Sequence, residues 1–285
     1  MKTRTIGTTT VSEIGLGGMP MSIEGRPEAA RSIATVQAAL DAGITVIDTA
    51  DAYLLEPGET GHNERLIAKA LAGYAGDTSG VLVATKGGHL RPGDGSWTID
   101  SSPAHLREAC EASLLALGVE AIGLYQLHRP DPTVDYADSL AAMRSLYDDG
   151  KVRMVGISNA TIAQIKQAQE IIGDALVSVQ NQYSPAYRSS EDELRYCGEQ
   201  GLAFLPWSPF GGISKAGDLG SSFAPYAEIA SQYGVSPQQV CLAWLLAKGG
   251  HVVPIPGASR PETITDSAQA GGLQLTDEEL ARLDT

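Results

Sequence analysis

The sequence has few cysteines and few positive charges, and it has no long apolar run. The three cysteines are widely separated and odd in number, which argues against a disulfide framework or a zinc site: Cys110, Cys197 and Cys241. They favour a cytoplasmic protein with reduced thiols. No apolar stretch approaches the roughly 20 residues that span a bilayer, and the N-terminus shows no apolar signal region.

Basic residues are outnumbered, with 20 Lys and Arg against 34 Asp and Glu, so the formal net charge is -14. An acidic surface repels nucleic acids and anionic membranes, and we expect neither as a partner. Nothing in the sequence requires a protein partner or an assembly larger than a monomer. We therefore expect the partner to be a small molecule.

The 285 residues are long enough for one barrel or two ordinary domains, and no linker divides them. Short apolar runs alternate with segments of helical periodicity. After a hairpin over 5–14, the pattern predicts strands at 15–19, 44–48, 81–86, 122–128, 152–158, 176–180, 202–207 and 252–255. It predicts helices at 29–42, 63–71, 102–117, 136–147, 161–172, 191–199, 223–233, 237–247, 261–269 and 276–283, the last with Thr276 and Glu279 as a capping box.

Eight strands alternating with helices predict an α/β fold, a (β/α)8 TIM barrel with an N-terminal β-hairpin, in which residues 1–285 form one domain. The competing fold is a doubly wound open sheet. That fold carries a glycine fingerprint after its first strand, and residues 15–18 lack the full spacing and the later acidic residue. The barrel is therefore the expected fold.

Three predicted strands end at side chains of catalytic type, namely Asp48, Lys86 and His128, and Tyr53 lies five residues beyond the first of them. Taken alone, each residue is more often a cap, a solvated charge or a surface histidine. Parallel strands of a barrel deliver their C-terminal ends to one mouth, where barrel enzymes do their chemistry. We therefore expect these four side chains to converge.

The four side chains suit the reduction of a carbonyl group. A buried Lys86 ammonium needs a counter-ion, and Asp48 on the neighbouring strand can supply it. The ammonium is expected to lower the pKa of Tyr53, which then protonates the substrate oxygen while His128 orients it. A metal site is not expected because a lysine would compete with the cation, and a hydrolase is not expected because no nucleophile is present.

The sequence resembles the aldo-keto reductases essentially from end to end. The segments that carry the resemblance are residues 48–53 (DTADAY), 63–67 (NERLI), 85–86 (TK) and 127–128 (LH). The resemblance implies a barrel, a nicotinamide cofactor and a proton-relay tetrad. In that tetrad Tyr53 is the acid, Lys86 and Asp48 tune it, and His128 orients the carbonyl.

The resemblance also implies a set of cofactor residues. Ser158, Asn159 and Gln180 correspond to holders of the nicotinamide amide, and Trp207 stands where the family usually has a stacked tyrosine. The remaining positions line the pyrophosphate and the adenosine: Ser208, Phe210, Gly212, Gly257, Ser259, Arg260 and Ser267. Arg260 favours NADPH, whereas Thr263 stands where many members place an arginine, so NADH use stays open.

Substrate specificity in such barrels is set by loops at the mouth. The expected pocket walls are Met19, Met21, Tyr53, Leu54, Trp97 and Trp207, with His89 and Arg129 as polar side chains. The loop that carries Trp97 reads equally well as a lid or as simple packing. The chain ends soon after its last helix, which favours an open site with broad acceptance of aldehydes. Two segments, 179–183 and 208–212, resemble bacterial members that reduce pyridoxal.

Two other functions stay open at this point. A non-catalytic nicotinamide-binding sensor or accessory subunit is one, and the intact tetrad argues against it. The other is a metal-dependent barrel hydrolase that uses Asp48, Asp51 and His128, and Lys86 argues against that.

Overall fold

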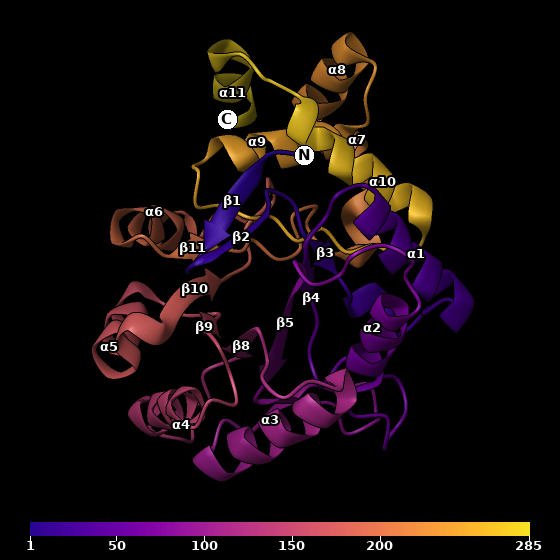
Figure 1. The fold of residues 1–285 in the computed structure, drawn as a ribbon. Coiled ribbons are helices and arrows are strands. Elements are labelled where there is room, and N and C mark those ends of the chain that lie inside the picture. The colour runs from indigo at the N-terminus through magenta and orange to yellow at the C-terminus, as the bar shows by residue number, and fades with distance from the viewer.

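The computed structural model describes residues 1–285, and its centre is a curled parallel sheet of seven strands (Figure 1). The order of hydrogen-bonded neighbours is β11-β10-β9-β8-β5-β4-β3. The strands are β3 (Leu16–Gly17), β4 (Val46–Asp48), β5 (Leu82–Gly87), β8 (Leu124–Leu127), β9 (Val155–Ser158), β10 (Leu176–Gln180) and β11 (Ala203–Phe204). Their order follows the chain, as expected for a barrel.

The barrel closes through residues 252–257, which lie between β11 and β3. This segment makes parallel bridges from Val252 to Phe204 and from Gly257 to Gly17. The amide of Gly17 donates to the carbonyl of Pro256 over 2.9 Å. Pro254 and Pro256 have no N–H to donate, so the ladder is interrupted and no regular strand forms. The prediction of a strand at 252–255 was therefore right in position and wrong in regularity.

The helices cover the outside of the sheet (Figure 1). They are α1 (Ala29–Asp41), α2 (His62–Ala72), α3 (Pro103–Leu117), α4 (Tyr136–Asp148), α5 (Ile162–Ile172), α6 (Glu191–Gln200), α7 (Leu219–Ser222), α8 (Ala224–Tyr233), α9 (Pro237–Ala247), α10 (Pro261–Gln269) and α11 (Asp277–Leu283). Four short 3-10 helices occur at Met19–Met21, Gly173–Ala175, Ile213–Asp218 and Ala270–Gly272. The expected capping box of Thr276 and Glu279 is present, and Thr161 and Gln164 form a second one.

An antiparallel hairpin of β1 (Thr3–Ile6) and β2 (Thr9–Ser12) precedes the barrel, as predicted. Its buried side chains Ile6 and Val11 belong to the same apolar cluster as Val46, Leu82 and Val253. These last three side chains come from barrel strands or from the closing segment. The hairpin thus packs on the apolar interior of the barrel.

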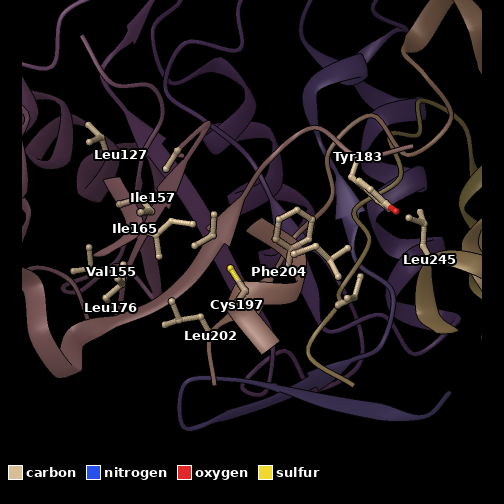
Figure 2. Packing of buried hydrophobic residues seen from close by; sticks show 14 of the residues in the cluster. Leu127, Val155, Ile157, Ile165, Leu176, Tyr183, Cys197, Leu202, Phe204 and Leu245 are labelled. Carbon is tan, nitrogen blue, oxygen red and sulfur yellow. The ribbon is translucent and has the colours of Figure 1, made fainter. Parts of the chain in front are cut away.

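The largest core lies between the sheet and its helices and contains 38 buried residues. Figure 2 shows part of it, with Ile165 and Cys197 of the helices among side chains of the strands. Trp244 of α9 stacks on Tyr183 with ring centroids 5.6 Å apart, and both are fully buried. The strongly apolar sequence of α9 is explained by this burial.

Alternation along the strands separates two environments. Val46 points to the interior cluster and Ile47 to the outer helices, so the next residue, Asp48, returns to the interior. On β5 the interior residues Leu82 and Ala84 are followed by Lys86. The interior is therefore apolar at the N-terminal ends of the strands and polar at their C-terminal ends.

A second small hairpin was not predicted. It consists of β6 (His89–Leu90) and β7 (Thr98–Ile99), which pair antiparallel and hold residues 91–97 between them. Each strand has only two residues, too few for a periodic signal. No helix of the structure combines the length and the apolarity needed to cross a bilayer.

Candidate active site

The C-terminal ends of neighbouring strands bring the four expected catalytic side chains together. Asp48 is the last residue of β4, Lys86 lies near the end of β5, and His128 follows β8. Tyr53 lies in the loop after β4, where its amide bonds to the carbonyl of Ala50 in a tight turn. All four are buried, with Tyr53 7% and His128 8% exposed.

Lys86 is the centre of the cluster. Its ammonium donates to Asp48 Oδ2 at 2.6 Å, to the carbonyl of Thr49 at 2.8 Å and to Tyr53 Oη at 3.2 Å. The three donors of the ammonium are thereby all used, as a fully buried charge requires. The predicted ion pair of Lys86 and Asp48 is present.

The other carboxylate oxygen of Asp48 faces two amides. Gln180 Nε2 donates to Asp48 Oδ1 at 2.7 Å, and Gln126 Nε2 donates to the same atom at 3.3 Å. Gln126 was missed in the sequence, although it lies two residues before His128 and therefore on the same side of its strand. Three side chains on three strands therefore fix the carboxylate: Lys86 on β5, Gln126 on β8 and Gln180 on β10.

His128 stands edge-on to the phenol ring, with centroids 5.9 Å apart and an interplanar angle of 81°. Its Nδ1 is buried and has no hydrogen-bond partner within the protein. Burial, together with the positive charge of Lys86, lowers the pKa of His128 well below its ordinary value. The imidazole is therefore neutral at physiological pH and offers one N–H donor.

The prediction that the pKa of Tyr53 is lowered was wrong. Burial raises the pKa of Tyr53 and outweighs the opposing effect of the Lys86 ammonium. Burial also acts against the charge of Lys86, but Asp48 and Tyr53 overcome it, and the pKa of Lys86 is raised. The cluster at neutral pH therefore holds a protonated phenol beside an ammonium.

Asp48, Tyr53 and His128 line a cleft of about 560 Å³, and Lys86 is fully buried beside Asp48 and Tyr53. The expected site residues that line it are Met19, Asp48, Tyr53, Trp97, His128, Arg129, Ser158, Asn159, Gln180, Trp207, Ser208, Phe210, Gly212 and Gly257. A second cleft, of about 310 Å³, is lined by Arg260, which precedes α10, and by Ser267, near the end of that helix. Phe210, Ala216 and Gly257 line both, so the two clefts adjoin.

Two expected pocket walls are corrected. Met21 is fully buried in the cluster that α1 and α2 make with the sheet, and so it cannot reach the cleft. Leu54 is 2% exposed and also lies outside the cleft, while its carbonyl accepts from Arg91. Ser259 is half-buried and lines neither cleft.

The expected nicotinamide residues form a connected group beside the tetrad. Asn159 Nδ2 donates to the carbonyl of His128 at 3.0 Å and to Ser158 Oγ at 2.9 Å. Asn159 and Ser208 are the two non-glycine residues with positive φ, at 58° and 49°. Such backbone is uncommon outside glycine and concentrates at functional sites.

Trp207 carries a further polar group without a partner. Its indole Nε1 is buried and makes no hydrogen bond within the protein, although the side chain lines the cleft. Gln180 has both amide hydrogens engaged, on Asp48 and on Gln126 Oε1 at 3.4 Å. Its own oxygen is the group left to accept a hydrogen bond in the cleft.

The Trp97 side chain packs against His89 and Arg91. It stacks on His89 with centroids 4.8 Å apart, the guanidinium of Arg91 lies 4.8 Å from its ring centre, and Arg91 pairs with Glu24. The side chain is 37% exposed. The packing interpretation of this loop is favoured, and the small hairpin presents Trp97 to the cleft.

Comparisons with known proteins agree with this geometry. A family model described as Aldo/keto reductase family matches residues 13–285. The chain is 33% identical over 285 residues to an uncharacterized oxidoreductase of Schizosaccharomyces pombe, covering 98% of this chain and 88% of that protein. It is 32% identical over 293 residues to the pyridoxine 4-dehydrogenase of Escherichia coli, covering 99% and 97%.

A solved structure is similar over nearly its whole length. The aldo/keto reductase from Klebsiella pneumoniae, determined in complex with NADP and acetate, has a TM-score of 0.80 and 29% identity, covering 99% of this chain and 94% of that one. The closed barrel, the tetrad at its mouth and these matches lead to one assignment. The chain belongs to the aldo/keto reductase family.

Proposed function

We propose that this protein reduces aldehydes and ketones to alcohols with NADPH, and that Tyr53 is the proton donor. The observation that carries the proposal is the position of the Lys86 ammonium, 2.6 Å from Asp48 Oδ2 and 3.2 Å from Tyr53 Oη, two side chains that line the cleft. This arrangement supports a protonated phenol that a substrate oxygen in the cleft can approach. Residues 1–285 are taken as one catalytic domain.

The side chains divide the work by their protonation states. Tyr53 keeps its proton because burial raises its pKa, and it gives that proton to the oxygen as negative charge develops there. The adjacent ammonium of Lys86 stabilises the phenolate that results. His128 is neutral and can donate a hydrogen bond to the same oxygen, which orients the carbonyl.

The cofactor residues support a nicotinamide bound along the joined clefts. When bound, the reduced nicotinamide supplies the hydride. We propose that Ser158, Asn159 and the free oxygen of Gln180 hold its carboxamide, and that the Trp207 indole contributes a ring face and a free N–H. The short glycine-containing segment 208–212 lines the passage to the second cleft.

A preference for NADPH rests on Arg260. It lines the second cleft and precedes α10, where the Glu262 amide is free to bind a phosphate, whereas Pro261 has no N–H and the Thr263 amide donates to the carbonyl of Arg260 at 3.2 Å. Its Nε donates to Thr263 Oγ1 at 2.9 Å, which leaves the other guanidinium donors available. Glu262 and Asp266 line the same cleft and oppose an added phosphate charge, so we propose that NADH is also accepted.

The relative from Escherichia coli suggests where to begin with substrates. It is a pyridoxine 4-dehydrogenase and matches this chain over 99% of its length. We propose pyridoxal as the first natural substrate to test, with pyridoxine as the substrate of the reverse reaction.

The test is the initial rate of NADPH oxidation, followed by ultraviolet absorbance, with 4-nitrobenzaldehyde and with pyridoxal. We expect turnover with both, retained in a chelator, and formation of the corresponding alcohol. NADPH binding without turnover of any aldehyde would favour the sensor alternative instead. Turnover that survives the chelator would exclude the metal-dependent hydrolase, which is also opposed by the engagement of both Asp48 oxygens with Lys86, Gln180 and Gln126.

A further inference from the structure

The charges that line the active-site cleft do not cancel. Three formally charged side chains border it, namely Glu24, Asp48 and Arg129. Glu24 is paired with Arg91, and Asp48 is paired with Lys86. Arg129 takes part in no salt bridge and in no side-chain hydrogen bond. The cleft therefore has one uncompensated positive charge in a protein whose net charge is -14.

Arg129 is close to the reacting end of the cleft. It follows His128 directly and is half-buried at the end of β8. It lines the cleft together with His128 and His89, and its positive charge contributes to lowering the pKa of both imidazoles. Its backbone is fixed as well, because its carbonyl accepts from Ser101 Oγ at 2.7 Å.

The neighbouring wall has a second polar group without a partner. His89 stacks on Trp97 and lies edge-on to His128, with its centroid 4.7 Å from that of His128. Its Nδ1 is buried and makes no hydrogen bond within the protein. Burial lowers the pKa of His89 to about 4, so the ring is neutral and adds no charge of its own.

We propose that Arg129 is a specificity residue that binds an anionic group on the substrate. The preferred substrates are then aldehydes or ketones that carry a carboxylate or another small anion, with His89 as a neutral hydrogen-bonding neighbour. A half-buried guanidinium that lacks a protein carboxylate can form a bidentate, charge-assisted pair with such a group. The inference rests on the proposed reductase function and deepens it.

The test compares two aldehydes that differ in charge, 4-carboxybenzaldehyde and its methyl ester. Steady-state constants are measured for the wild-type protein, Arg129→Gln, Arg129→Lys and the control Arg153→Gln. Arg153 is exposed, makes no salt bridge and lies before β9, so its replacement removes one positive charge away from the cleft. Each aldehyde is compared between proteins, so the different intrinsic reactivities of the two aldehydes cancel.

For Arg129→Gln we expect kcat/KM with the carboxylate to fall about 10- to 100-fold, mainly through KM, while the ester changes by about twofold or less. Arg129→Lys should recover part of the loss, and Arg153→Gln should match the wild type. Equal losses on both aldehydes, or no loss on the carboxylate, would overturn the proposal. Failure of the wild-type protein to reduce either aldehyde would instead count against the proposed function.

Inhibition by benzoate gives a second measurement, which distinguishes an anion site in the active-site cleft from one in the second cleft. Benzoate should compete with the methyl ester, and benzamide should bind more weakly. The benzoate effect should disappear in Arg129→Gln. Competition of benzoate with NADPH rather than with the aldehyde would place the anion in the cofactor cleft and would contradict the role of Arg129.

Discussion

Gln180 Nε2 donates to Asp48 Oδ1 over 2.7 Å, although the two residues are 132 positions apart in the chain. Gln180 also lines the cleft beside Ser158 and Asn159. The same side chain therefore borders the proposed nicotinamide site and fixes the carboxylate that holds Lys86. We infer that the cofactor site and the proton relay share one hydrogen-bond network, in which a change at either end affects the other.

Replacing Tyr53 with phenylalanine removes the proposed proton donor and leaves the ring. Because only the transition state uses the hydroxyl, we expect kcat to fall by about 10²- to 10⁴-fold with little change in NADPH affinity. The measurement combines steady-state kinetics with a fluorescence titration of NADPH. Tyr187→Phe, at a tyrosine that is 43% exposed, serves as the control and should keep full activity. Near-normal turnover of Tyr53→Phe would show that another group is the acid.

The ion pair of Lys86 and Asp48 predicts a non-additive pattern of stability. Lys86→Met leaves the buried Asp48 without its cation, and a loss of about 3–5 kcal/mol in the free energy of unfolding is expected. Adding Asp48→Asn removes the orphaned charge and should recover most of the loss, while activity stays absent. Urea denaturation of the two single variants and the double variant measures the coupling. Additive losses would contradict a pair that acts as a unit.

Much of the fold and the tetrad followed from the sequence because the signals were local. Short apolar runs between helical segments predicted the strands. The polar residues at the ends of three of these runs are Asp48, Lys86 and His128. The Gly-rich segment between His89 and Ile99 gave no periodic signal, so the small hairpin was missed. Pro254 and Pro256 interrupted the last strand without moving it.

The pKa of Tyr53 and the position of Met21 could not be predicted from the sequence, because both depend on the three-dimensional surroundings. Lys86 was expected to lower the pKa of Tyr53, but the depth of burial, which decides the direction, is known only from the fold. Met21 was expected among the pocket walls together with Met19. The 3-10 helix Met19–Met21 turns one methionine to the cleft and the other into the core.

The protonation states predict a flat pH profile for reduction. The pKa of Tyr53 is raised, so the acid stays protonated through neutral pH, and the pKa of His128 is lowered, so the imidazole stays neutral. We expect kcat to be constant from about pH 6 to 9 and to fall only above the ordinary tyrosine pKa of about 10. Single-turnover rates, measured by stopped flow, isolate the chemical step. An inflection near neutral pH would mean that one of the two assignments is wrong.

Asp51 is expected to limit stability. It is 2% exposed, its Oδ1 has no partner, and burial together with the neighbouring Glu64 raises its pKa well above the ordinary value. The folded state then binds more protons than the unfolded state above the ordinary carboxyl pKa, so stability falls as pH rises towards the folded pKa. Asp51→Asn should raise the melting temperature at about pH 8 by roughly 2–4 °C or more.

The gain from Asp51→Asn should shrink at about pH 4, where the wild-type carboxyl is already protonated. Glu170→Gln is the matched control, because that side chain is exposed on α5 and makes no salt bridge. Calorimetry at the two pH values measures the melting temperatures of the wild type and of both variants. A variant less stable than the wild type at the higher pH would mean that the ionised carboxylate stabilises the fold.

Arg260 predicts how the protein distinguishes its two cofactors. It lines the cleft at the start of α10, where Glu262 and Asp266 are the neighbouring charges. Arg260→Ala should raise KM for NADPH by about tenfold or more and leave KM for NADH within about twofold, because only NADPH carries the 2′-phosphate that a guanidinium binds. Kinetics with each cofactor at a saturating aldehyde concentration measure both constants, and Arg107→Ala, at an exposed position of α3, is the control. Equal effects on the two cofactors would mean that Arg260 does not contact the phosphate.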